Sequence, residues 1–210
     1  MGSVGLQTLV GNVALLVTAV IKSRCAHLRK SGMLFFYSVR PVVSEKNHAS
    51  DTAAISMDKE KIMYQRILVA VDGSSTSDRA LQEAIGFAKE QHAVLRIVHV
   101  IDVVPIILDV EFIDVGAMQR ALHQSGQQVL DRAREKVRAA GIDAETRLVE
   151  TDTPAQRPAN KIVQEARAWP AELLVIGTHG RRGLDHLLLG SIAEAVARLA
   201  PMPVLLIRGE

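Results

Sequence analysis

Five short apolar runs alternate with helix-like segments through the last 148 residues of this 210-residue chain. The runs cover residues 67–71, 94–100, 144–149, 173–176 and 203–207; the second contains Arg96 and His99, and the third contains three polar residues. Apolar residues recur at helical spacing over about 77–91, 115–140, from Pro158 onward and over 191–199. Continuous apolar runs are typical of strands that are buried on both faces. Strands that alternate with helices predict a parallel sheet with right-handed crossovers, and hence an α/β domain.

A glycine-punctuated loop with the spacing G-x2-G-x9-G-S follows the fourth apolar run. Its glycines are Gly177, Gly180 and Gly190, and it ends at Ser191, where a helical pattern begins. A strand, a glycine loop and a helix N-terminus together gather backbone amides around a phosphate. Glycine permits a positive φ and lets a ligand approach the backbone closely. We expect Ser191 to be the N-cap of the helix or to contact an anion.

This loop resembles the nucleotide-binding loop of the universal stress protein family, whose members with this pattern bind ATP. Residues 63–74, which end in Asp72-Gly73-Ser74, resemble the opening strand of that family, and residues 95–100 and 201–207 resemble its second and closing strands. The resemblance covers about residues 63–210. It implies an adenine nucleotide α-hydrolase-like fold: an open five-stranded parallel sheet of order 3-2-1-4-5, with helices on both faces. The order reverses between strands 1 and 4, so a ligand is expected at their carboxyl ends.

The resemblance also implies the residues of a nucleotide site. Asp72 would contact the nucleotide near its base and ribose, although an Asx-turn or a helix cap would also explain an aspartate there. Val100 would line the adenine pocket, or would be a plain core valine, and Ala70 and Ile176 are weaker candidates for the same pocket. The phosphates would lie at the glycine loop, which holds these candidates: Gly177, His179, Gly180, Arg181, Gly190 and Ser191.

The charged residues of the loop can be interpreted in more than one way. Arg181 and Arg182 suit a phosphate, but such a pair is more often a solvated loop face. His179 would donate to phosphate or have no role, and His99, within a strand, is expected to be a buried structural histidine. The sequence has no G-x-S-x-G elbow and no Walker A lysine. No set of nucleophile, base and orienting group can be assembled from it.

Charge divides unevenly along the chain. Residues 1–62 carry 8 Lys/Arg and 4 Asp/Glu, whereas residues 63–210 carry 17 and 19. The domain therefore lacks the positive excess that binding to nucleic acid requires. Cys25 is the only cysteine, which excludes an intrachain disulfide and fits a reducing compartment.

The first 62 residues are expected to be disordered or not part of the working protein. Residues 4–21 are apolar with polar interruptions, and basic residues follow them, which also permits a signal anchor with the domain in the cytoplasm. We favour upstream sequence over an anchor, because Met63 resembles the natural start of the family. No membrane association is then expected.

The resemblance implies a cytoplasmic, regulatory ATP-binding module of the stress response, with Mg²⁺ bridging the phosphates where it is present. Two alternatives stay open: a slow ATPase or phosphotransferase at the same site, and an interaction module that binds no nucleotide. The last strand is apolar and would lie at a sheet edge, which invites pairing. The family forms a two-fold dimer through this strand, so we expect a homodimer with the Leu206 side chain at its interface.

Overall fold

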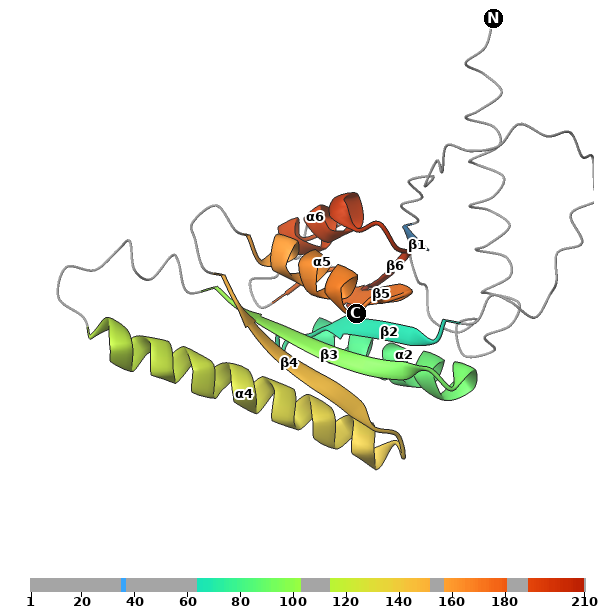
Figure 1. Ribbon diagram of the computed structural model, residues 1–210, viewed down its shortest axis with the longest axis horizontal. Coiled ribbons are helices and arrows are strands. Elements are labelled where there is room, and N and C mark those ends of the chain that lie inside the picture. Colours follow the sequence, from blue (N-terminus) through green and yellow to red (C-terminus); the bar gives the residue numbers. More distant parts are fainter. Residues whose placement is uncertain (1–34, 37–63, 103–113, 152–156, 181–188, 210) are drawn as a thin grey trace, which may run out of the picture.

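The computed structural model describes residues 35–36, 64–102, 114–151, 157–180 and 189–209. In these ranges six strands form one sheet, and helices cover both of its faces (Figure 1). The strands are β1 (Phe35–Phe36), β2 (Arg66–Ala70), β3 (Val94–Ile101), β4 (Ala144–Glu150), β5 (Leu173–Gly177) and β6 (Val204–Ile207). The helices are α2 (Ser75–Gln91), α4 (Val115–Ala139), α5 (Pro158–Ala168) and α6 (Ser191–Leu199).

The strand order is β1-β6-β5-β2-β3-β4. The five strands from β2 to β6 are parallel and, counted along the chain, have the order 3-2-1-4-5, so the predicted topology is confirmed. Strand β1 was not anticipated. It pairs antiparallel with β6, at the edge that the sequence analysis left open.

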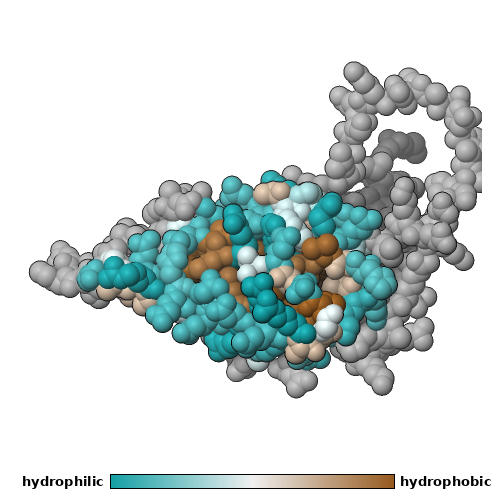
Figure 2. All heavy atoms as spheres, turned by 60° about the horizontal axis from the view of Figure 1, so that its bottom comes forward, coloured by the Kyte–Doolittle hydropathy of each residue, from teal (hydrophilic) through white to brown (hydrophobic). Residues whose placement is uncertain are grey.

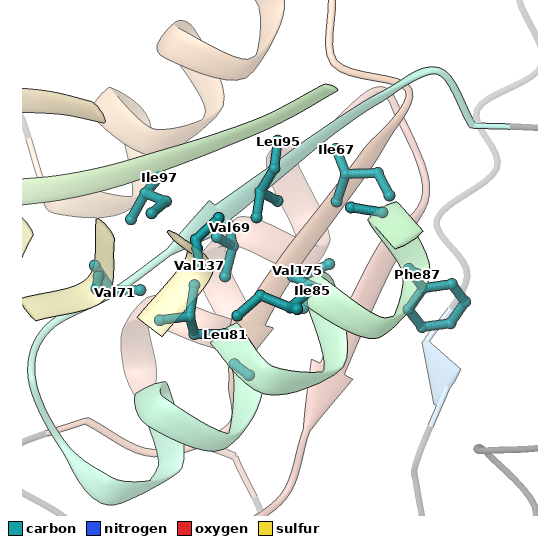
Figure 3. Packing of buried hydrophobic residues seen from close by; sticks show 14 of the residues in the cluster. Ile67, Val69, Val71, Leu81, Ile85, Phe87, Leu95, Ile97, Val137 and Val175 are labelled. Atoms are coloured by element: carbon teal, nitrogen blue, oxygen red, sulfur yellow. The ribbon is translucent and has the colours of Figure 1, made fainter. Parts of the chain in front are cut away.

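Two layers of helices enclose the sheet. Helix α4 packs on β3 and β4, α2 packs on β2 and β5, and α5 and α6 lie on the opposite face (Figure 1). Figure 3 shows the first layer, where Leu81 and Ile85 of α2 and Val137 of α4 lie among Val69 and Ile97 of the sheet. The second core cluster lies between the sheet and α5 and α6. Because β2, β5 and β6 send alternate side chains into the two layers, both faces of this part of the sheet are buried.

Strand β6 is buried on both faces although it lies at the edge of the parallel sheet. Leu205 and Ile207 belong to the first core cluster, and Val204 and Leu206 belong to the second. The side chain of Leu206 was expected at a dimer interface, and this expectation is wrong: the residue is 0% exposed within the domain. Helices cover its side chain, so only the backbone of β6 is available at the sheet edge.

The element boundaries lie close to those predicted. Helix α2 begins at Ser75, two residues earlier than expected, because Ser74 is its N-cap and accepts a hydrogen bond from the amide of Ser77 at 3.1 Å. Pro158 opens α5 as expected. Gly141, with φ +79°, follows the end of α4 in the left-handed region that favours glycine.

A charged cluster lies at the amino end of the sheet, far from the carboxyl ends where a ligand is expected. Arg96 of β3 pairs with Glu145 of β4 and, at 2.8 Å, with Glu165 of α5. Its guanidinium lies 4.5 Å from the ring centroid of Trp169, the only tryptophan of the chain. The fluorescence of Trp169 should therefore report on folding of the domain.

Hydrophilic residues surround smaller hydrophobic areas on the face of the domain that Figure 2 shows. Across the ranges that the structure describes, no helix combines the length and apolar character needed to cross a membrane. The apolar stretch at residues 4–21 and Cys25 lie outside these ranges.

Candidate functional site

The carboxyl ends of β2 and β5 meet at the point where the strand order reverses. Ala70, the last residue of β2, is in register with Ile176 of β5. Two residues beyond β2, Asp72 lies against the glycine loop that follows β5: a Cβ built on Gly180 would be 2.6 Å from Oδ2 of Asp72. Two motifs that are about a hundred residues apart in the sequence thus face one another, as expected at a switch point.

Asp72 is held by a tight turn. Its Oδ1 accepts a hydrogen bond from the amide of Ser74 at 2.9 Å, which is the Asx-turn considered above, and Gly73 has φ +81°. The Asp72 amide donates to the hydroxyl of Ser77 at 3.0 Å. The turn fixes Oδ1, while Oδ2 faces the glycine loop. Sequence reasoning missed Ser77, whose hydroxyl supports the turn and whose amide donates to the N-cap Ser74.

Thr178 joins the loop to its neighbours, and sequence reasoning missed it as well. Its amide donates to the carbonyl of Ile207 at 2.7 Å, and its carbonyl accepts from the amide of Gly190 at 2.7 Å. The hydroxyl lies 3.0 Å from Nδ1 of His179, which is half-buried, and Thr178 itself is 3% exposed. Its position between the first two glycines of the motif was the available signal. Thr178 connects β5, β6 and the start of α6.

The loop glycines are required for close approach. A positive φ, one of the two reasons given for them, does not occur at Gly177, Gly180 or Gly190. A Cβ on Gly177 would lie 2.9 Å from Cγ2 of Thr76, and one on Gly190 would lie 2.9 Å from the carbonyl oxygen of Thr178. The atoms that approach these two glycines belong to the protein itself, so replacing either glycine would disturb the loop before any ligand is bound.

Helix α6 begins without a side-chain cap. Gly190 is its N-cap, with φ −72° and ψ 151°, so the prediction that Ser191 caps the helix is wrong. The reason is that the bond from the Gly190 amide to Thr178 holds Gly190 extended, and the helix starts at the next residue. Ser191 is exposed in the first turn. First-turn amides with no side-chain cap are suited to an anion. Arg181 and Arg182 lie outside the described residues.

Three of the predicted residues form an apolar surface beside the turn and the loop. Ala70, Val100 and Ile176 lie at or near the carboxyl ends of three adjacent strands and contribute to one face of the sheet. Ala70 and Ile176 are 7% exposed, and Val100 is partly buried. On the other face His99 is buried, with its Nδ1 2.7 Å from the carbonyl oxygen of Val71, as expected of a structural histidine.

Comparisons with known proteins agree with this geometry. Residues 63–208 match the model of the Universal stress protein family. The chain is 31% identical to Universal stress protein YxiE of Bacillus subtilis over 153 residues, which cover 70% of this chain and 100% of that protein. A crystal structure of a universal stress protein from Burkholderia pseudomallei is 35% identical, with TM-score 0.57, and covers 70% of this chain and 97% of that one.

A third match is the crystal structure of a universal stress protein in complex with cAMP. It is 28% identical, with TM-score 0.50, and covers 70% of this chain and 99% of that one. Three observations support the same assignment. They are the sheet order, the contact between Asp72 and the glycine loop, and the family match over residues 63–208. The chain belongs to the universal stress protein family.

Proposed function

We propose that this protein binds ATP where the carboxyl ends of β2 and β5 meet, and that it acts as a cytoplasmic regulatory module whose nucleotide occupancy is its signal. The observation that carries the proposal is the close approach of Gly180 to Oδ2 of Asp72. It brings an acidic turn, an apolar surface and the N-terminus of α6 to one edge of the sheet. An apolar surface suits the adenine, a carboxylate suits the ribose hydroxyls, and a helix N-terminus suits the phosphates.

Each part of the nucleotide has a counterpart in this arrangement. The adenine would rest on Ala70, Val100 and Ile176, and the ribose and base would meet the carboxylate of Asp72. The phosphates would lie at the glycine loop and the first turn of α6, where backbone amides and the helix dipole favour negative charge. His179 and Arg181 would add donors. A relative solved in complex with cAMP supports a ligand that contains adenine.

Mg²⁺ would be held mainly by the phosphates. Among the residues that the structure describes, no group of three or more His, Cys, Asp or Glu side chains could hold a metal ion. Mg²⁺ commonly binds through substrate phosphates and water, with one or two carboxylates. ATP affinity should therefore fall when Mg²⁺ is removed, while the unliganded protein keeps its thermal stability.

Titration calorimetry of the full chain with ATP tests the site. Asp72→Ala removes both carboxylate oxygens, whereas Asp72→Asn keeps an oxygen that can accept from the amide of Ser74 and so preserves the turn. We expect the alanine variant to lose most of its ATP affinity and the asparagine variant to lose less. If both folded variants bind ATP as the wild type does, Asp72 is not part of the site.

Hydrolysis is tested separately, because a regulatory module and a slow ATPase would bind the same ligand. Purified protein is incubated with ATP and Mg²⁺, and ADP release is measured over hours. We expect ATP to be recovered intact. ADP release that Asp72→Ala abolishes would favour the enzyme instead.

We further propose that a homodimer forms through the backbone edge of β6. The amide of Leu174 donates to the carbonyl of Pro203, and that of Thr178 donates to the carbonyl of Ile207. Because successive residues of a strand point their backbone groups to opposite sides, Val204 and Leu206 direct theirs away from β5. Backbone groups at a strand edge that point away from the sheet are suited to a second strand. Light scattering on protein with this edge free should give the mass of a dimer.

A further inference from the structure

The edge of β6 is already occupied in part by this chain itself. Strand β1 pairs antiparallel with β6, with Phe36 opposite Val204 and Phe35 opposite Leu205. These two residues lie in the first 62 residues, which were expected to lie outside the fold. The pairing places a segment of the extension at the same edge through which a second copy would bind.

The register shows which backbone groups are covered. Val204 directs its N–H and C=O away from β5, as argued above, and therefore toward β1. Phe36, directly opposite, belongs to the kind of antiparallel pair in which both residues turn their backbone groups toward each other. Phe35 and Leu205 form the alternate kind of pair. The contact is thus made by backbone groups, and it depends on the N–H of Phe36.

We propose that β1 is an intramolecular cap on the edge of β6, which competes with a second copy of the chain for that edge. The competition with a second copy rests on the dimer proposed above. The pairing of β1 with β6 does not, and it is tested separately. While β1 is in place, the outward backbone groups of Val204 are unavailable to another strand. Release of β1 frees them.

Two features suit β1 to reversible release. Among the residues that the structure describes, the strand pairs through two, Phe35 and Phe36, and so short a pairing is marginal by itself. Twenty-seven residues, 37–63, separate Phe36 from Tyr64, which is the first described residue of the domain. A chain of that length reaches up to about 90 Å when it is extended, so β1 can leave without disturbing the domain.

The cap covers the amino end of β6 and leaves the nucleotide site alone. Its partners are Val204 and Leu205, whereas the contact of β6 with the glycine loop is made by Ile207, at the carboxyl end. Loss of the cap should therefore change assembly without changing ATP affinity.

The test compares Phe36→Pro with Phe36→Ile in the full chain. Proline removes the N–H that faces Val204, whereas isoleucine keeps it and has a high preference for strands. Hydrogen exchange is followed at the amide of Val204, with the amide of Leu174 in β5 as an internal control for folding. Light scattering on the same samples gives the mass, and titration with ATP checks the nucleotide site.

We expect a monomer in the wild type and in Phe36→Ile, with the Val204 amide protected. In Phe36→Pro, exchange at Val204 should become about 2- to 13-fold faster at low protein concentration, which corresponds to the loss of one hydrogen bond. Dimers should appear as the concentration rises, and exchange at Leu174 should stay unchanged. If exchange at Val204 becomes faster but no dimer forms, the cap stands and the proposed dimer fails.

Three results would overturn the cap. The Val204 amide could exchange at the same rate in the wild type and in Phe36→Pro. The wild type could be a dimer that both variants preserve, which would mean that a second copy covers the edge. The wild type could also be a dimer that Phe36→Pro dissociates, and β1 would then pair with a neighbouring copy and not with its own domain.

Discussion

Gly180→Ala perturbs the contact that joins the two halves of the candidate site. The new Cβ would lie 2.6 Å from Oδ2 of Asp72 and 3.8 Å from its Cγ. Real Cβ atoms essentially never approach another atom within 3.0 Å, so one of the two groups must move. The obstructing atom is the end of a side chain, and the carboxylate can therefore rotate. Rotation would break the 2.9 Å hydrogen bond from the amide of Ser74 and would turn Oδ2 away from the loop.

The size of the effect follows from that bond. A hydrogen bond to a charged group contributes about 1.5–3 kcal/mol, so the free energy of unfolding should fall by at most this amount. If the Asp72 carboxylate makes a contact of similar strength with the nucleotide, its displacement should raise the Kd for ATP about 10- to 150-fold. The fold should remain intact, because most domains are stable by about 5–15 kcal/mol.

The assay is titration calorimetry with ATP and Mg²⁺, and urea unfolding followed by the fluorescence of Trp169 measures stability. Gly86→Ala is the matched control, because a Cβ at Gly86 in α2 would meet nothing within 4 Å. That variant should bind ATP as the wild type does and gain about 0.5–1 kcal/mol from the better helix propensity of alanine. In a double variant with Asp72→Ala, the loss of affinity should be no larger than in Asp72→Ala alone. A folded Gly180→Ala protein with a Kd within twofold of the wild type would refute this reasoning.

Three further changes test the scaffold. Gly126→Ala should lower the free energy of unfolding by about 1–3 kcal/mol in urea titrations, because its Cβ would lie 2.8 Å from Cδ1 of Leu148 and force α4 away from the sheet. Leu206→Asp should give an unfolded chain by circular dichroism, since it buries a charge in the core, and Leu206→Ala should cost about 2–5 kcal/mol. A folded Leu206→Asp monomer would contradict this burial. Ser74→Ala removes the cap of α2 and should cost about 0.5–2 kcal/mol in thermal unfolding, whereas Ser74→Asp, which can still accept from the amide of Ser77, should stay close to the wild type.

Most of the domain fold could be predicted from the sequence because its signals are local and repeated. The central strands β2, β5 and β6 are rich in consecutive apolar residues, and each helix carries an apolar stripe, so the elements were placed within one or two residues. Strand order is a property of the whole chain, and it came from the resemblance to a family. Strand β1 could not be predicted, since two phenylalanines carry no alternation and their pairing depends on an edge formed about 170 residues later.

The candidate site was predicted in part, for similar reasons. Residue types and spacing located the glycine loop and Asp72, and the structure brings them together. Spacing could not distinguish a glycine that needs a positive φ from one that allows a close approach, and it placed the cap of α6 one residue late. The role of Thr178 could not be predicted, because its backbone amide and carbonyl make the hydrogen bonds to Ile207 and Gly190. These groups are the same in every residue but proline.

Both faces of β6 are buried, which has a consequence for sequence divergence and for the specificity of association at this edge. Both rows of its side chains are committed to the interior, so a neighbour at this edge would meet mostly the peptide backbone, which is common to all protein chains. Substitutions on the outer surface would then leave this edge able to pair, and two different proteins that keep such an edge would be able to pair with one another. Discrimination between correct and incorrect associates would have to be encoded outside β6, in the timing of exposure or in the segments that flank it.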